Sequence, residues 1–148
     1  MASKFYEKIL IATDGSEYTK NAVDYGIDLA KSTGAKLFAI YVVDTAAFAS
    51  IPMDAAWESM YELLKQEGDM AIKYVAQRAE VEGLEVEGNL IEGHPADEII
   101  RYSEKNSISL IVMGTLGKSG LDRFLLGSVA EKVVRNSKIP VLVVRGKK

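Results

Sequence analysis

The sequence predicts an α/β protein, a three-layer α/β/α arrangement in which five parallel strands alternate with four helices. Short apolar segments rich in branched residues alternate along the chain with longer segments of helical periodicity, which is the pattern of consecutive β-α-β units. No linker, low-complexity tract or internal repeat interrupts this alternation. The 148 residues, 48% hydrophobic and 26% charged, suit one domain over residues 1–148 with an ordinary hydrophobic core.

The first half of the chain predicts two strands and two helices. Apolar runs mark the strands, and the sequence Asp14-Gly15-Ser16 ends the first of them. Gly34 stands where a helix C-cap belongs, and Asp54 is a suitable N-cap for a long helix. The expected elements are a strand over residues 8–13, a helix ending at about 33, a strand over 36–43, a loop over 44–53 and a helix ending near 83.

The second half predicts three strands and two helices. The segment 85–92 alternates polar with apolar residues and therefore predicts an edge strand. Pro95 suits the first position of a helix, and Asp97 and Glu98 complement the positive end of its dipole. The expected elements are a strand over 85–92, a turn over 93–95, a helix, a strand over 109–113, a glycine-rich loop over 114–127, a helix over 128–137 and a strand over 141–144.

Composition excludes several classes of function. The chain has no cysteine, which excludes disulfides, thiol nucleophiles and Cys-ligated metal sites. No segment approaches the roughly 20 apolar residues of a membrane span, and the net charge of −3 lacks the basic surplus typical of nucleic-acid binders. We therefore expect a soluble, cytoplasmic protein without nucleic-acid or membrane partners. The single histidine, His94, lies in a Gly-x-Pro sequence and is interpreted as a turn or capping residue.

Two loops hold the residues most suited to ligand binding. In open α/β sheets, ligands bind beyond the carboxyl ends of strands, where neighbouring connections diverge. At such ends lie the turn at residues 14–16 and the loop that follows the fourth strand. Gly114 permits close approach of a ligand to the backbone, and Gly127-Ser128 opens the last helix, whose N-terminus favours an anion. Together these residues predict a phosphate site closed by a helix N-terminus.

Neither standard nucleotide-binding fingerprint is present. Gly117-Lys118-Ser119 looks like the end of a P-loop, but the first glycine of that motif would fall on Val112. The motif G-x-G-x-x-G is also absent after the first strand.

The loop does match a different signature. Its spacing, Gly114-x2-Gly117-x9-Gly127-Ser128, is the G-x2-G-x9-G-[ST] pattern of ATP-binding universal stress proteins. I-L-I-A-T-D-G-S looks like that family's first strand and turn, G-H-P-A-D-E-I-I like its later turn and helix, and L-I-V-M-G and I-P-V-L-V-V like its fourth and fifth strands. The sequence thus resembles the ATP-binding subgroup of the universal stress protein (UspA-like) family. The resemblance implies a sheet in the order 3-2-1-4-5, of the adenine nucleotide alpha hydrolase-like type, which brings the two loops together.

The resemblance also implies a ligand, ATP with or without Mg²⁺, and a set of site residues. Ala12, Thr13 and Asp14 would meet the adenosine part, and Val42 would lie against adenine. Asp14 would bond either a ribose hydroxyl or a metal ion on the phosphates. Many relatives have proline in place of Ala12, but the contact expected there is through the backbone. The remaining site residues come from the second loop and the last helix, namely Gly114, Thr115, Gly117, Lys118, Ser119, Gly120, Gly127, Ser128 and Val129.

Several of these residues also have simpler roles open to them. Asp14 alternatively shapes a turn with Gly15 and caps the first helix. Ser128 is expected to cap the last helix, with or without a phosphate contact, and Lys118 is either a phosphate ligand or an exposed loop lysine. Three residues of the long helix are expected in the core or in an interface rather than around a cofactor, namely Trp57, Met60 and Tyr61.

The expected function is that of an ATP-binding regulatory or stress-response module, a homodimer through the edge strand 141–144. Hydrolysis is expected to be slow at most, and no residue is assigned a catalytic or metal-binding role. One alternative is an ATP-consuming enzyme of a related fold, a nucleotidyl transferase or ATP pyrophosphatase. That enzyme needs S-G-G-x-D-S after the first strand and a second substrate pocket, for which 148 residues leave little room. Another alternative is a nucleotide-free dimeric scaffold, which has no use for an open, glycine-lined site.

Overall fold

The computed structural model describes residues 5–50, 52, 54–115 and 127–146. Four predicted site residues, Gly117, Lys118, Ser119 and Gly120, lie outside the described residues. Within the described part, no helix is long and apolar enough to cross a membrane.

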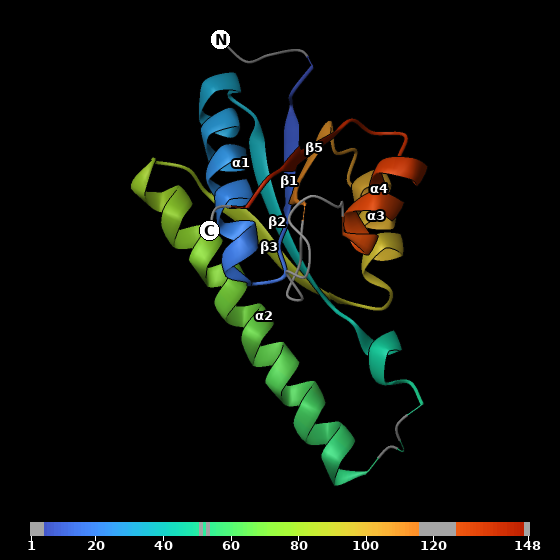
Figure 1. The fold of residues 1–148 in the computed structure, drawn as a ribbon. Coiled ribbons are helices and arrows are strands. Elements are labelled where there is room, and N and C mark those ends of the chain that lie inside the picture. Colours follow the sequence, from blue (N-terminus) through green and yellow to red (C-terminus); the bar gives the residue numbers. More distant parts are fainter. Residues whose placement is uncertain (1–4, 51, 53, 116–126, 147–148) are drawn as a thin grey trace.

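Five parallel strands form one sheet in the order β3-β2-β1-β4-β5 (Figure 1). This confirms the expected order, with its reversal between β1 and β4. The strands are β1 (Lys8–Ala12), β2 (Lys36–Val43), β3 (Val86–Glu92), β4 (Leu110–Gly114) and β5 (Val141–Val144).

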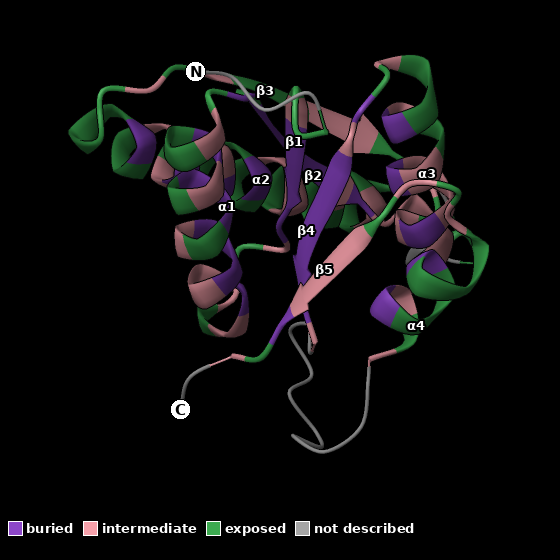
Figure 2. Ribbon diagram, turned by 90° about the horizontal axis from the view of Figure 1, so that it is seen from above, coloured by how far each residue is buried: buried purple, intermediate pink, exposed green. Residues whose placement is uncertain are grey.

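Helices cover both faces of the sheet, as the predicted three layers require. One face carries α1 (Lys20–Thr33) and α2 (Ala55–Val81), and the other carries α3 (Pro95–Lys105) and α4 (Ser128–Asn136) (Figures 1 and 2). Two short 3₁₀ helices, η1 (Glu17–Thr19) and η2 (Thr45–Phe48), follow β1 and β2. Both therefore lie at the edge of the sheet where the carboxyl ends of the strands meet.

A hydrophobic core lies on each side of the sheet because successive side chains of a strand point to opposite faces. Ile9 and Ile11 of β1 pack towards α1 and α2, whereas Leu10, between them, packs towards α3 and α4. All three side chains are fully buried. The central strands are accordingly buried and the edge strand β3 is largely exposed (Figure 2), as its alternating sequence predicts.

The structure corrects some element bounds. The first strand ends at Ala12 and not at Thr13, and a 3₁₀ turn separates it from α1, which begins only at Lys20. Gly15 has a φ of +77° in the intervening turn, a conformation that glycine adopts without strain. The loop expected over 44–53 contains η2. Gly34, also at a φ of +77°, ends α1 as predicted, and the Asp54 side chain accepts from two N–H groups at the start of α2.

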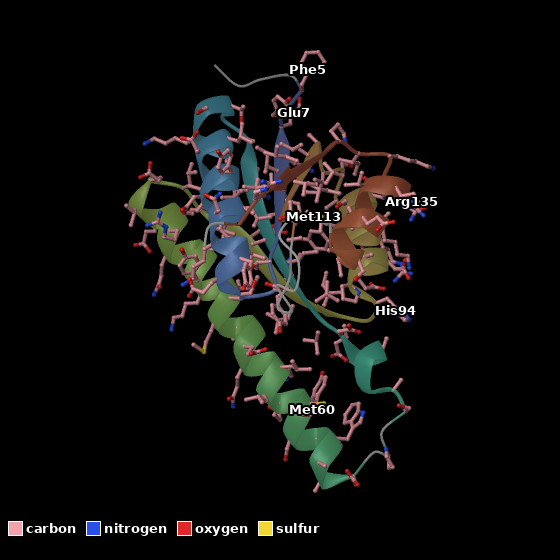
Figure 3. The ribbon with its side chains drawn as sticks, viewed as in Figure 1. Phe5, Glu7, Met60, His94, Met113 and Arg135 are labelled. Atoms are coloured by element: carbon pink, nitrogen blue, oxygen red, sulfur yellow. The ribbon has the colours of Figure 1, made fainter. Side chains whose placement is uncertain are left out.

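The N-terminal half of α2 extends past the end of the sheet (Figure 1). The buried residues of α2 begin only at Gly68. Trp57 and Tyr61 stack on each other with ring centroids 5.4 Å apart, and Met60, labelled in Figure 3, is 40% exposed. These side chains, expected in the core or an interface, therefore lie outside the fully buried core.

Candidate functional site

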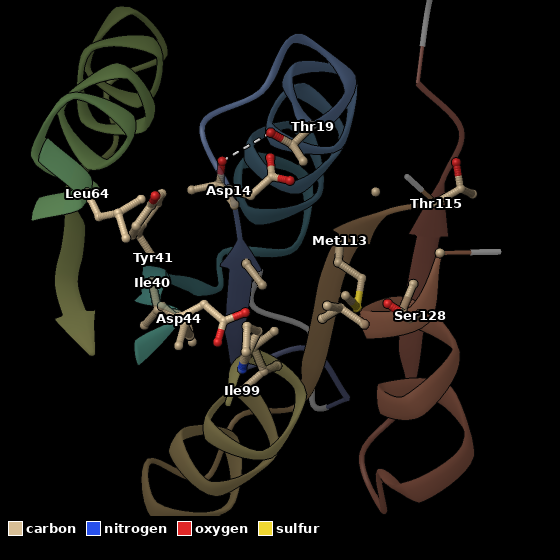
Figure 4. A pocket seen from close by; sticks show the side chains of 18 residues that line it. Asp14, Thr19, Ile40, Tyr41, Asp44, Leu64, Ile99, Met113, Thr115 and Ser128 are labelled. Carbon is tan, nitrogen blue, oxygen red and sulfur yellow. Dashed lines mark hydrogen bonds between the residues drawn. The ribbon is translucent and has the colours of Figure 1, made fainter. Parts of the chain in front are cut away.

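A pocket of about 300 Å³ opens beyond the carboxyl ends of β1, β2 and β4. It lies where the strand order reverses, on the side of the sheet that α3 and α4 cover (Figure 4). This is the place where open α/β sheets bind ligands. Nine of the predicted site residues line it, namely Ala12, Thr13, Asp14, Val42, Gly114, Thr115, Gly127, Ser128 and Val129.

The turn after β1 forms the middle of the pocket, and a chain of hydrogen bonds fixes it. The Gly15 N–H donates to the Thr13 hydroxyl at 3.0 Å, and this hydroxyl lies 3.1 Å from that of Thr19. The Ser16 N–H donates to Asp14 Oδ1 at 2.9 Å. Asp14 therefore shapes the turn and lines the pocket at once. It does not cap α1, whose N-cap residue is Thr19, without a side-chain cap.

The end of β2 forms one side of the pocket. The Thr13 N–H donates to the Ile40 carbonyl at 3.1 Å, and the pairing of β1 with β2 stops at Ile40. β2 continues to Val43 beside β3. Because backbone groups alternate along a strand, the N–H and C=O of Val42 point to the side on which β1 has ended. They therefore face the pocket.

The ends of β4 and α4 form the opposite side. The Gly127 N–H donates to the Thr115 carbonyl at 2.6 Å, which holds the start of α4 against the end of β4. Gly127 is the N-cap residue and has no side chain, so the first N–H groups of α4 have no side-chain cap. Thr115 Oγ1 is buried without a hydrogen-bond partner among the described residues. This side therefore offers donors and a positive helix end to an anion.

The structure corrects the role expected for Ser128. The sequence predicts that it caps α4, but it is the first residue of the helix and Gly127 takes the cap position. Its side chain is exposed at the pocket (Figure 4). The hydroxyl is therefore not committed to capping the helix.

Sequence reasoning missed other lining residues, among them Asp44, Leu64, Pro95 and Ile99. Asp44 directly follows β2, so the strand-end rule applied to that strand would have found it. Leu64 comes from α2, which reaches the pocket only because it passes over the end of β2. No pattern in the sequence around Leu64 predicts that it lines the pocket.

Polar contacts hold α2 beside the pocket. The Tyr41 hydroxyl donates to a carboxylate oxygen of Glu67 at 3.3 Å, and the Tyr61 hydroxyl donates to Glu92. The hydrogen bond to Glu92 raises the pKa of Tyr61 above its usual value. Both bonds tie α2 to the strands on which the pocket is built, one to β2 and the other to the end of β3.

Charge is distributed unevenly around the pocket. The carboxylates of Asp14 and Asp44 line its middle and its β2 side, whereas the N-terminus of α4 makes the other side positive. No group of three or more His, Cys, Asp or Glu side chains suited to a metal ion occurs among the described residues. The arrangement can bind an elongated ligand with an anionic group at α4 and a neutral, partly apolar group at β2.

A second cavity, of about 390 Å³, lies on the α1 and α2 side of Thr13 and Asp14. Lys20, Glu67 and Tyr74 line it. Lys20 is paired with Glu17 at 2.8 Å, and this hydrogen bond raises the pKa of its ammonium group. The described residues thus form a second cavity beside the first, and the expectation that the chain has little room for a second substrate pocket stays a prediction.

Comparison with known proteins agrees with the fold. A sequence model of the universal stress protein family matches residues 5–145. A universal stress protein of Methanocaldococcus jannaschii is 49% identical over 140 residues, which cover 95% of this chain and 82% of the relative. The solved structure of hypothetical protein MJ0577 superposes with a TM-score of 0.84 at 29% identity, covering 97% of this chain and 99% of that one. A universal stress protein in complex with cAMP gives a TM-score of 0.70 at 26% identity, with 96% and 98% of the two chains covered.

The fold and the pocket define an open-sheet α/β protein with a pocket at its topological switch point. The match over residues 5–145 and the 49% identity make the assignment specific. The chain belongs to the universal stress protein family.

Proposed function

We propose that the protein binds ATP in this pocket and acts as a nucleotide-dependent regulatory module. The observation that carries the proposal is the polarity of the pocket. On one side lies the backbone of Val42, beyond the end of the pairing with β1, and on the other lies the N-terminus of α4, whose N-cap residue Gly127 provides no side-chain cap. The related protein in complex with cAMP supports an adenine nucleotide as the ligand class.

The base binds at the β2 side. An N–H donor beside a C=O acceptor, as Val42 presents them, complements N1 and the exocyclic amine of adenine. Apolar side chains of Ile40, Leu64 and Ile99 surround this side and suit a flat aromatic ring. Polar backbone recognition within an apolar setting therefore favours adenine binding here.

The phosphates bind at the α4 side. Suitable donors are the first N–H groups of α4, the Ser128 hydroxyl and the buried Thr115 hydroxyl, which has no partner among the described residues. A helix N-terminus attracts an anion both by its free N–H groups and by its dipole. Mg²⁺ enters with the phosphates as Mg–ATP and keeps several of its waters, since no described residue at the α4 side offers a carboxylate.

Asp14 binds the ribose, because it follows β1, which lies between β2 and β4. A hydrogen bond to a charged acceptor contributes roughly 10- to 100-fold in affinity. We expect Asp14→Asn to weaken ATP binding by about tenfold and to leave 2′,3′-dideoxy-ATP binding unchanged, measured by calorimetry. Asparagine retains an oxygen for the Ser16 N–H, so the turn is kept. Equal weakening for both nucleotides would show that Asp14 acts only by shaping the turn.

Any hydrolysis is slow, because the described groups at the α4 side are N–H donors and hydroxyls, which bind phosphate and do not activate water. Bound ATP thus serves as a signal that alters assembly or partner choice. We place the protein in the cytoplasm and expect no nucleic-acid partner, in line with its net charge of −3.

The protein forms a homodimer through the open edge of β5. The Pro140 carbonyl accepts from the Ile111 N–H of β4 at 3.0 Å, and the Val144 carbonyl accepts from the N–H of Thr115, the residue after β4, at 3.1 Å. By alternation, the backbone N–H and C=O of Val141 and Val143 point away from β4, to the edge of the sheet. An unpaired apolar edge strand is a ready surface for pairing with another chain.

We expect Val143→Pro to convert the dimer to a monomer, because proline removes an outward N–H and leaves the β4 bonds in place. Light scattering coupled to size exclusion measures the mass. The control, Val143→Thr, keeps the N–H and should remain dimeric. A dimer of unchanged stability in the proline variant would exclude the β5 edge as the interface.

The simplest test of the whole proposal is the nucleotide that accompanies the protein. Protein purified without added nucleotide is denatured, and the released small molecules are separated by anion exchange. ATP at close to one molecule per chain supports the proposal. ADP or AMP would indicate turnover or another specificity and would favour the enzyme alternative.

A further inference from the structure

Asp44 is the one described lining residue on the β2 side that carries a charge. It follows β2 directly and lies two residues after Val42, so both residues are directed to the same face of the sheet. Its half-buried side chain lines the pocket, as does that of Ile99 from α3 (Figure 4).

The position of this carboxylate restricts what it can bind. Strands in a sheet lie about 4.8 Å apart, so the ends of β2 and β4, on either side of β1, are about 10 Å apart. A carboxylate repels phosphate, and the phosphate-binding groups lie at the β4 side. An ionised carboxylate only accepts hydrogen bonds. The ligand atom beside Asp44 is therefore a hydrogen-bond donor, and because Asp14 takes the ribose hydroxyls in the proposed arrangement, this donor lies on the base.

Adenine has one donor group on its edge that fits this position, the exocyclic amine at C6. The amine carries two N–H groups, and the Val42 carbonyl accounts for one of them. We propose that Asp44 accepts the second N–H and thereby selects adenine against 6-oxo purines such as guanine and hypoxanthine. This inference rests on the proposed function and adds to it a residue that sets the base specificity.

The selectivity arises because the contact with Asp44 is attractive for adenine and repulsive for a 6-oxo purine. A 6-oxo purine places a carbonyl oxygen beside the Asp44 carboxylate, so a hydrogen bond is replaced by the contact of two acceptors. Sites built to bond a particular N–H discriminate strongly against an analogue that lacks it, because the polar groups of the protein are left unpaired. We expect ATP to bind at least about 100-fold more tightly than ITP.

The experiment compares three ligands and three forms of the full-length protein. ATP, ITP and N6,N6-dimethyl-ATP are titrated by calorimetry into the wild type, Asp44→Asn and the control Asp28→Asn, which changes an exposed residue of α1. In the wild type and the control, ITP and the dimethyl analogue should both bind at least about 100-fold more weakly than ATP. In Asp44→Asn, the ratio of ITP to ATP affinity should rise by at least about tenfold, since the amide offers an N–H to the 6-oxo group.

The outcomes separate this inference from the proposed function. Wild-type protein that binds no nucleotide at millimolar concentration overturns both. ATP binding with an unchanged ITP ratio in Asp44→Asn overturns the role of Asp44 alone. If the variant does not fold, the titrations of the wild type test the inference. Equal affinities for ATP and N6,N6-dimethyl-ATP would overturn it, because they would show that hydrogen bonds from the amine do not contribute to binding.

Discussion

We expect Ser128→Asp to abolish most ATP binding while making the protein slightly more stable. Ser128 is the first residue of α4 and lines the pocket. A carboxylate there interacts favourably with the helix dipole, by about 0.5 kcal/mol. The same carboxylate would face the phosphates, and two charges about 4 Å apart near a protein surface repel by up to about 4 kcal/mol. Because Ser128 is exposed and partly screened by solvent, we expect ATP affinity to fall by roughly 100-fold.

This prediction is specific because the substitution should lower the ATP affinity and raise the stability of the protein. Calorimetry gives the affinity and thermal unfolding gives the stability of each variant. Ser128→Asn is the matched control, because asparagine has nearly the same size as aspartate but carries no charge. This variant should bind ATP with an affinity within about tenfold of the wild type. Binding of ATP by Ser128→Asp as tightly as by Ser128→Asn would show that the phosphates do not lie at the start of α4.

The second large effect concerns the packing beneath the site. We expect Gly26→Val to lower the free energy of unfolding by about 3 kcal/mol or more. A Cβ at Gly26 would lie 2.6 Å from Cγ1 of Ile11 and 3.8 Å from Cβ of Val112. Ile11 and Val112 are fully buried, so they have little space to move. The measurement is the thermal midpoint, which should fall by roughly 10 °C for a chain of this length.

A neighbouring position controls for the helix propensity of valine. Tyr25 on the same helix is 52% exposed, and Tyr25→Val should lower the midpoint by only a small amount because intrinsic propensities of these residues are similar. If the two variants melt at the same temperature, then α1 does not contact β1 as closely as the structure indicates. The close contact matters for the site, because β1 leads directly into the turn that holds Asp14.

Much of the fold follows from local patterns in the sequence. The bounds of β2 agree with the prediction because its apolar run is interrupted at both ends by a charged residue, Lys36 and Asp44. The end of α1 is equally well defined, because Gly34 adopts the left-handed conformation of a C-cap. β4 is shifted by one residue relative to the prediction. Gly114 extends that strand by pairing with Val144, which apolar character alone does not reveal.

The site was predictable where it depends on strand ends and less so elsewhere. The residues after β1 and β4 line the pocket because parallel strands end at one edge of the sheet. The predicted N-cap of α4 was wrong by one residue. Glycine and serine are both acceptable N-cap residues, so the sequence does not distinguish Gly127 from Ser128. Leu64 could not be predicted, because its place in the pocket depends on how α2 crosses β2.

The central claim, that this pocket binds ATP, is tested most directly by titrating Mg–ATP into nucleotide-free wild-type protein and into Ser128→Asp. The account predicts saturable binding of one ATP per chain in the wild type, with an ATP-dependent rise in thermal stability. Both signals should be strongly reduced in the variant. A wild-type protein that shows neither binding heat nor a stability shift at millimolar Mg–ATP would contradict the claim.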